Sequence, residues 1–216
     1  MNLTLLHTSP VHVPVFDALR DADHPGLELS HVVREELLER ARVEGPEAVT
    51  GEVRALLDAA VADGADAVLC TCSTLGAVAE GLAANLGVAV LRVDRPMAAR
   101  AVAEGRQIAV VATLRSTFGP TLDLIEEEAG RAGREVSVRT VFVDGAWELF
   151  LAGDRDGYLA LVATAIDGIA DADVIVLAQA SLADAAARSR TTLSVLSSPR
   201  PGLGAAASEC AGANKA

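Results

Sequence analysis

The sequence predicts an α/β protein made of two related halves, and three observations support this prediction. Short apolar runs typical of buried parallel strands alternate with longer segments whose apolar residues recur at helical spacing. Polar residues follow several of these runs, at the point where a strand would end. Such residues recur at similar distances, 64 positions from Thr8 to Cys72 and 66 from Thr113 to Gln179. We therefore expect two pseudo-symmetric αβ domains, each with a mainly parallel sheet flanked by helices, and an active-site cleft between them.

The first part of the chain, up to Gly105, contains four expected strands separated by helices. The opening run ends in the polar turn 7–10, and Pro46 follows Gly45, where proline suits the first turn of a helix. Residues 65–69 are apolar apart from one acid, as expected of a buried strand. The expected strands are 2–6, 27–33, 65–69 and 88–93, and the expected helices are 16–21, 34–43, 46–63, 75–86 and 95–103.

The rest of the chain repeats this pattern. The run 107–112 ends in a turn rich in threonine and serine, and the run 135–143 is rich in β-branched residues. The run 174–177 is wholly apolar and also ends in small polar residues. The expected strands are 107–112, 135–143, 174–177 and 193–196, and the expected helices are 120–130, 147–151 and 158–169.

The composition excludes several classes of protein. The chain has 216 residues, of which 51% are hydrophobic, so it can bury a substantial core. Its net charge of −12 opposes binding to nucleic acid or to anionic membranes, because both require a basic surface. No apolar run is as long as a membrane span, and the chain opens on a strand pattern rather than on a basic leader with a cleavage site. We expect a cytoplasmic protein that binds neither nucleic acid nor membrane.

Cys72 lies where a buried strand is expected to end and a helix to begin, with Ser73 or Thr74 as the helix cap. Ligands bind at the carboxyl ends of strands in α/β folds, and the amides and dipole of a helix start favour a thiolate and lower its pKa. The alternative is an inert buried thiol, which is what we expect of Cys70 on the same strand. The three cysteines do not indicate a disulfide framework, and no second Cys or His pair completes a metal site.

Three stretches carry a resemblance to a known family. Residues 72–74, Cys-Ser-Thr, resemble a Cys-Asn-Thr motif with serine in place of asparagine. Residues 108–113, with the Ser-Thr pair at 116–117, resemble the strand that opens a second domain and ends in a threonine-rich turn. Residues 173–180 occupy the position at which this family usually has the motif Leu-Gly-Cys-Thr. These motifs resemble those of the aspartate/glutamate racemase superfamily, which includes hydantoin racemases, maleate isomerases and arylmalonate decarboxylases.

The resemblance implies a domain organisation and a way of working. It implies a first αβ domain over 1–94, to which a C-terminal segment of about 195–216 returns, and a second αβ domain over 95–194. It also implies an enzyme without a cofactor, often a homodimer. The composition agrees with the absence of pyridoxal phosphate, because Lys215 is the sole lysine and no interior lysine could carry a Schiff base.

The resemblance further implies two catalytic cysteines, one on each side of the substrate carbon. Cys72 matches the first, whereas Gln179 occupies the place of the second and cannot titrate, so a two-thiol mechanism is in doubt. His7, His12 and Cys210 are the alternatives for an opposing acid, and for each a purely structural role is the competing interpretation. The hydroxyls and amides that we expect to hold a substrate carboxylate belong to Thr8, Ser9, Ser73, Thr74, Thr113, Ser116, Thr117, Ala180 and Ser181.

The expected function is a cofactor-independent racemase or isomerase that moves a proton on a small carboxylate, of the amino acid or hydantoin class, through the Cys72 thiol. One alternative is a lyase or isomerase that needs a single thiol, such as a malonate-type decarboxylase or a maleate isomerase-like enzyme. Another is a binder of small anions without catalysis. Helix capping is the competing interpretation for the hydroxyl residues, and Arg115 is either a carboxylate clamp or a solvated surface arginine.

Overall fold

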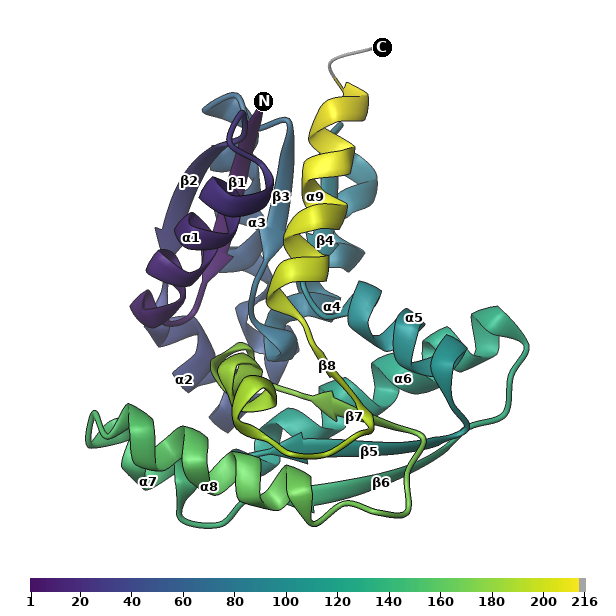
Figure 1. Ribbon diagram of the computed structural model, residues 1–216. Coiled ribbons are helices and arrows are strands. Elements are labelled where there is room, and N and C mark those ends of the chain that lie inside the picture. The colour runs from purple at the N-terminus through teal and green to yellow at the C-terminus, as the bar shows by residue number, and fades with distance from the viewer. Residues whose placement is uncertain (214–216) are drawn as a thin grey trace. The chain divides into compact units, whose positions relative to one another are not determined.

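The computed structural model describes residues 1–213, which divide into two compact units. One unit holds residues 1–94 together with the chain from Pro199 onward, and the other holds Arg95–Ser198. Within the described residues, each unit contains one sheet of four parallel strands covered by helices (Figure 1). This arrangement confirms the predicted fold class.

The sheet of the first unit has the strand order β2-β1-β3-β4, and every neighbouring pair is parallel. Parallel neighbours require crossover connections, which the helices provide. The strands are β1 (Asn2–His7), β2 (Glu28–Val33), β3 (Ala67–Cys70) and β4 (Ala89–Arg92). The helices are α1 (Val13–Asp23), α2 (Glu35–Glu44), α3 (Thr50–Ala62), α4 (Ser73–Gly81) and α9 (Pro199–Ala213), with short 3-10 turns η1 (Pro10–His12), η2 (Pro46–Val49) and η3 (Ala83–Asn85).

The two faces of this sheet pack against different helices, because successive strand residues point to opposite sides. Leu3 and Leu5 of β1 pack in one cluster with Phe16 of α1 and with apolar residues of α9. Leu6 packs in another cluster with apolar residues of α2, α3 and α4. His7 therefore points to the face of α1 and α9, and its ring centroid lies 5.6 Å from that of Phe16.

The sheet of the second unit repeats the same topology, with the order β6-β5-β7-β8 and parallel pairing throughout. One of its two apolar clusters contains the fully buried Tyr158. The strands are β5 (Gln107–Ala112), β6 (Ser137–Phe142), β7 (Val174–Leu177) and β8 (Ser194–Ser197). The helices are α5 (Arg95–Glu104), α6 (Phe118–Ala132), α7 (Ala146–Leu151) and α8 (Arg155–Asp167), with 3-10 turns η4 (Arg115–Thr117) and η5 (Ala180–Arg188).

The strand register gives the physical meaning of the repeated spacing in the sequence. In the first sheet Leu6 pairs with Cys70, 64 positions later. In the second sheet Val111 pairs with Leu177, 66 positions later. The residues two positions beyond each pair are therefore neighbours at the carboxyl edge of their own sheet, and these are the pairs Thr8 with Cys72 and Thr113 with Gln179.

Two features of the C-terminal region differ from the sequence prediction. We expected residues from about 195 to return to the first domain, but β8 pairs with β7 and the change of unit falls at Pro199. No helix was expected over 199–213, where α9 lies, because its glycines lower the helix propensity. Packing outweighs helix propensity here. Gly202 lies so close to Val93 that a Cβ atom at position 202 would lie 2.5 Å from the Val93 carbonyl oxygen.

Candidate active site

Cys72 is the cap of helix α4, a role that the sequence had suggested for Ser73 or Thr74. β3 ends at Cys70, Cys72 has extended backbone angles of φ −104° and ψ 115°, and α4 begins at Ser73. Ser73 and Thr74 are thus the first two helical residues, both half-buried. Their position places backbone amides around the Cys72 side chain, as expected at a helix start.

The surroundings of the Cys72 thiol act on its pKa in opposite directions. The Thr8 side chain and the amides of Thr74 and Leu75 favour the thiolate and act to lower the pKa, although Sγ makes no regular capping hydrogen bond. Burial acts against them and is the largest effect, with a smaller contribution from the Asp94 carboxylate. The pKa of Cys72 is consequently raised, so the prediction of a lowered pKa was wrong. The sequence could not show this burial, which leaves the residue only 9% exposed.

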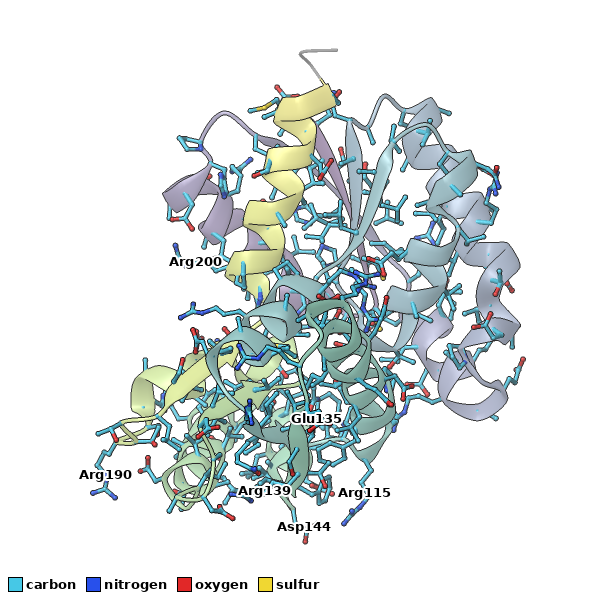
Figure 2. All side chains as sticks on the ribbon, turned by 90° about the vertical axis from the view of Figure 1, so that its right-hand side faces the viewer. Arg115, Glu135, Arg139, Asp144, Arg190 and Arg200 are labelled. Atoms are coloured by element: carbon cyan, nitrogen blue, oxygen red, sulfur yellow. The ribbon has the colours of Figure 1, made fainter. Side chains whose placement is uncertain are left out.

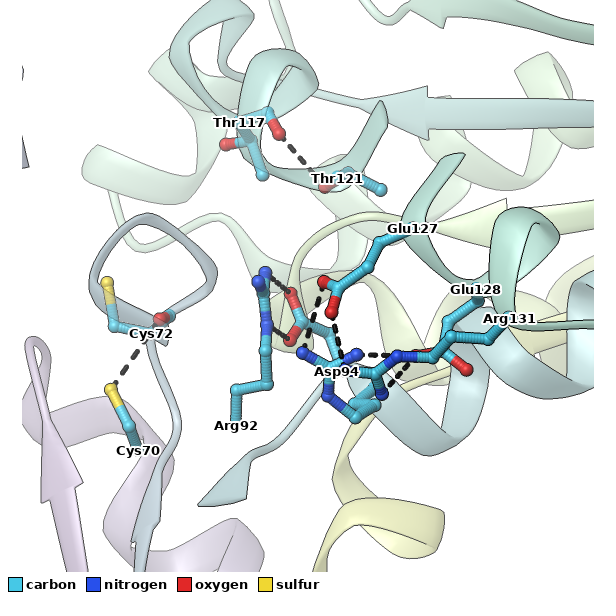
Figure 3. A network of polar contacts seen from close by, with 10 residues as sticks. Cys70, Cys72, Arg92, Asp94, Thr117, Thr121, Glu127, Glu128 and Arg131 are labelled. Carbon is cyan, nitrogen blue, oxygen red and sulfur yellow. Dashed lines mark hydrogen bonds and ion pairs between the residues drawn. The ribbon is translucent and has the colours of Figure 1, made fainter. Parts of the chain in front are cut away.

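The other two cysteines are structural. Cys70 is fully buried in β3, its Sγ contacts the Cys72 carbonyl at 3.7 Å (Figure 3), and burial raises its pKa. Cys210 is buried in α9, where its Sγ lies 3.9 Å from the Asn2 carbonyl, and burial raises its pKa to about 11. Asn2 begins β1 and Thr8 follows its end, so about 20 Å of extended chain separates them. Cys210 therefore lies at the amino edge of the first sheet, away from Cys72, and the structure contradicts its candidacy as the opposing acid.

His7 and His12 are close to each other but are poor acids at neutral pH. Their ring centroids lie 6.4 Å apart. Burial, followed by the neighbouring His31 and His12, lowers the pKa of His7 to about 3, and burial lowers that of His12 to about 4. Both rings are neutral near pH 7 as a result. His7 also points to the face of its sheet opposite to the cluster that contains Cys72.

His31, to which the sequence gave no role, completes a hydrogen-bonded chain through this region. His7 Nδ1 lies 2.8 Å from Thr71 Oγ1, and His7 Nε2 lies 2.8 Å from His31 Nδ1. The far nitrogen of His31 lies 3.3 Å from Asp17 Oδ1. The β1–β2 register pairs His7 with Val33 and so puts His31 on the same face of the sheet as His7. These hydrogen bonds could not be predicted, because a single sequence does not reveal strand register.

In the second unit, Gln179 is held by its side-chain oxygen. Oε1 accepts hydrogen bonds from the Thr113 amide at 2.7 Å, the Thr113 hydroxyl at 3.0 Å and the Leu114 amide at 3.3 Å. Rotating the amide by half a turn would set its NH₂ group against two backbone N–H donors, so the orientation is determined. Gln179 can therefore present only N–H donors beyond this contact, and it can neither accept nor release a proton.

The contact of Thr113 with Gln179 extends into the core through Tyr158. The Tyr158 hydroxyl lies 2.8 Å from Ser181 Oγ, and the Thr113 side chain acts to lower the pKa of the phenol. Burial raises the pKa of Tyr158, which keeps the phenol protonated. The contacts thus join Thr113 to Gln179 and Ser181 to Tyr158, which the sequence had placed only as a helical residue.

The remaining predicted binding residues lie in the turns after β1, β5 and β7. Ser9 caps η1 and Ala180 begins η5, and both are half-buried. Thr117 is buried and caps α6, whereas Ser116 is exposed. Arg115 is exposed at the surface of the second unit, with its guanidinium 4.0 Å from the Phe142 ring centroid (Figure 2). This cation–π contact gives Arg115 a structural partner that the sequence did not reveal.

A buried ion pair lies at the end of β4 in the first unit. Arg92 donates from Nε and a terminal nitrogen to the two Asp94 oxygens, at 2.7 and 3.0 Å, and both side chains are at most 4% exposed (Figure 3). Gly76 of α4 makes room for it, since a Cβ atom there would lie 2.9 Å from Arg92 Cβ. The sequence predicted a strand over 88–93 but did not reveal this pair.

No group of three or more His, Cys, Asp or Glu side chains in the described chain is arranged to hold a metal ion. None of the described helices combines the length and the apolar character needed to cross a membrane.

The fold and the site define a class of protein: a parallel α/β protein of two topologically identical units, with a thiol at a strand-to-helix turn in the first and an amide at the matching turn in the second. The family model described as Asp/Glu/Hydantoin racemase matches residues 13–201, and the chain belongs to this family. Membership confirms the resemblance seen in the sequence and the prediction of an enzyme of the isomerase class. No protein of curated function matches the sequence.

Solved structures of the same fold include racemases and a decarboxylase. An aspartate racemase from Picrophilus torridus has a TM-score of 0.70 at 13% identity, covering 99% of this chain and 94% of its own. An allantoin racemase from Pseudomonas fluorescens has a TM-score of 0.61 at 22% identity, covering 96% and 90%. A glycine-to-cysteine mutant of arylmalonate decarboxylase has a TM-score of 0.65 at 18% identity, covering 98% and 94%. At such identities the similarity concerns the fold alone.

Proposed function

We propose that this protein is a cofactor-independent enzyme that transfers a proton to or from the α-carbon of a small carboxylate by means of the Cys72 thiol. The observation that supports this most is the set of groups around Sγ, namely the Thr8 side chain and the amides of Thr74 and Leu75, all of which favour the thiolate. An inert buried cysteine, such as Cys70, has no comparable set of donors.

The proposed step is a balanced proton transfer. The Cys72 thiolate takes the α-proton, so that the C–H bond breaks, the S–H bond forms and the electron pair moves into an enolate. The reverse step returns the proton from sulfur to carbon. Residues that follow strands of each sheet are proposed to bind the substrate oxygens through hydroxyls and helix-start amides: Thr8, Ser9, Ser73, Thr74, Thr113, Ser116, Thr117, Ala180 and Ser181.

A second candidate is a single-thiol lyase or isomerase, and two observations favour it. Because burial raises the pKa of Cys72, the protonated thiol predominates near neutral pH and is suited to donate a proton. Gln179, which occupies the position where the resemblance implies a second cysteine, offers no titrating group. In a decarboxylase the C–C bond would break to release carbon dioxide, and the S–H proton of Cys72 would then pass to the resulting enolate.

One experiment distinguishes the candidates. Aspartate, glutamate, a monosubstituted hydantoin and an aryl malonate are incubated with the protein in deuterated water, and NMR and chiral chromatography follow α-proton exchange, inversion and loss of carbon dioxide. Exchange or inversion that disappears in Cys72→Ala supports the first candidate, and decarboxylation that disappears in the same variant supports the second. Activity that survives in Cys72→Ala contradicts both, and binding of these compounds without any turnover indicates a small-anion binder.

A further inference from the structure

A chain of hydrogen bonds connects the surface of the first unit to the turn that carries Cys72. It runs from Asp17 on α1 through His31 on β2 and His7 on β1 to Thr71, which follows β3. Asp17 is 42% exposed and the His31 side chain 16%, whereas His7 is fully buried. The proposed function uses none of these four residues.

The inner end of this chain lies directly beside the Thr8 contact with Cys72. His7 and Thr71 precede Thr8 and Cys72 by one residue on each of the two strand ends, and their hydrogen bond is 2.8 Å long. The two interactions are successive rungs between the same segments. Thr8 and Cys72 therefore follow directly on the two residues that the His7–Thr71 bond joins.

Counting hydrogens along the chain gives the arrangement that satisfies the Asp17 carboxylate when the chain carries no extra proton. His31 must donate from Nε2 to the Asp17 carboxylate, which can only accept. A neutral His31 then accepts at Nδ1 from His7 Nε2–H, and a neutral His7 accepts at Nδ1 from the Thr71 hydroxyl. The Thr71 hydroxyl has a single hydrogen, so in this arrangement it cannot donate to the Leu6 carbonyl, 3.1 Å away.

One added proton reverses the chain. A doubly protonated His31 donates to Asp17 and also to His7 Nε2, so His7 becomes the Nδ1–H tautomer and donates to Thr71 Oγ1. The Thr71 hydroxyl is then free to donate to the Leu6 carbonyl. His7 stays neutral throughout, in agreement with a pKa lowered to about 3 by its burial. The added charge rests on His31, which is partly exposed and faces a carboxylate.

We propose that Asp17, His31, His7 and Thr71 form a single-proton relay, in which protonation of His31 switches the tautomer of His7 and the donor direction of Thr71, and thereby repositions Thr8 against Cys72. The charged and titratable groups around the relay are Arg20, 3.6 Å from Asp17 on the same helix, and His12, beside His7. His7 and His31 are positioning residues, since they act through Thr71 and Thr8. The relay itself does not depend on the proposed function, whereas its effect on catalysis does.

The relay is tested by NMR of the histidine ring nitrogens in ¹⁵N-labelled protein between pH 8 and 5. The relay requires that His7 changes from the Nε2–H to the Nδ1–H tautomer at the pH at which His31 gains a proton. The chemical shifts of the two His7 ring nitrogens should report this change, and they should show that His7 stays neutral. His31→Asn removes the group that takes up the proton and should leave the His7 tautomer independent of pH. His24→Asn is the matched control, because His24 belongs to the same unit but lies outside the relay. A His7 tautomer that does not change while His31 titrates overturns the proposal.

The link to Cys72 is tested by alkylation with iodoacetamide in a Cys70→Ala/Cys210→Ala background. The alkylation rate of Cys72, corrected for the pH dependence of a free thiol, should show a step at the pH at which His31 gains a proton. We expect this step in the Cys70→Ala/Cys210→Ala protein and when Thr71→Ser, which keeps the hydroxyl, is added to it. The step should be absent when Thr71→Val or His31→Asn is added instead. Each unit of pKa change at Cys72 corresponds to a tenfold change in thiolate fraction, so a shift of about 0.5 unit is measurable as about threefold. If the NMR switch is present but the step is absent, the relay stands and its positioning of Cys72 is refuted.

Discussion

At the scale of single residues, the thiols of Cys70 and Cys72, two positions apart, have different environments. Cys72→Ala should abolish turnover while leaving the fold intact, because the substituted residue lies after the strand in a turn. Cys70→Ala removes a fully buried group from β3 and should cost about 1 kcal/mol of unfolding free energy without loss of activity. Turnover assays paired with urea unfolding check both expectations. If Cys70→Ala were the inactive variant, the catalytic assignment would belong to the wrong thiol.

His7 should make the protein less stable in acid. Its pKa is about 3 in the folded protein and about 6.5 when unfolded, so below pH 6.5 the unfolded chain binds a proton that the native state does not. Stability is therefore fully present above pH 6.5 and falls towards pH 3, by about 1.4 kcal/mol per pH unit for this residue. We expect His7→Asn to be less stable than the parent at pH 7. Its free energy of unfolding, measured with urea at pH 7, 6, 5 and 4, should fall less steeply with decreasing pH than that of the parent. An unchanged slope would contradict the lowered pKa.

At the scale of elements, α9 offers a matched pair of glycines. In Gly202→Ala the new methyl group would lie 2.5 Å from the Val93 carbonyl oxygen and 2.6 Å from Val93 Cγ2, so overpacking should cost about 1–3 kcal/mol. In Gly204→Ala the nearest atom is His24 Nε2 at 3.9 Å, and the higher helix propensity of alanine should stabilise by up to about 1 kcal/mol. Thermal unfolding compares the two. Equal effects would mean that the close contact of α9 with Val93 is absent in solution.

The elements also show what a single sequence can predict. Strands such as β3 and β7 were located because they are short, apolar and bounded by polar residues, and their spacing to β1 and β5 agreed with the register. Helix α9 was missed because contacts with the first sheet, not propensity, stabilise it. The Thr8–Cys72 and Thr113–Gln179 pairs followed from strand ends. The His7–His31 chain, the Arg92–Asp94 pair and the raised pKa of Cys72 did not, since each depends on register or burial.

At the scale of the whole molecule, the repeated topology places a titrating thiol after β3 and a non-titrating amide after β7. A single thiol that takes a proton from one face of a carbon returns it to the same face. In deuterated water, an accepted amino acid or hydantoin should therefore exchange its α-hydrogen with retention, faster than its enantiomer appears. Inversion as fast as exchange would require a second acid other than Cys210, which lies at the amino edge of its sheet.

Gln179→Cys should raise inversion relative to exchange, because it restores the second thiol that the family resemblance implies. Removing the glutamine side chain also frees three donors, the Thr113 amide, the Thr113 hydroxyl and the Leu114 amide, which favour a thiolate in their vicinity. Gln179→Ser is the matched control, since it frees the same donors without supplying a thiol. The gain depends on placement, because an error of about 1 Å can cost about a hundredfold in rate. The ratio of inversion to exchange, measured for both variants on the same substrate, decides the matter: an equal ratio in the two would mean that the residue at position 179 does not reach the reacting carbon.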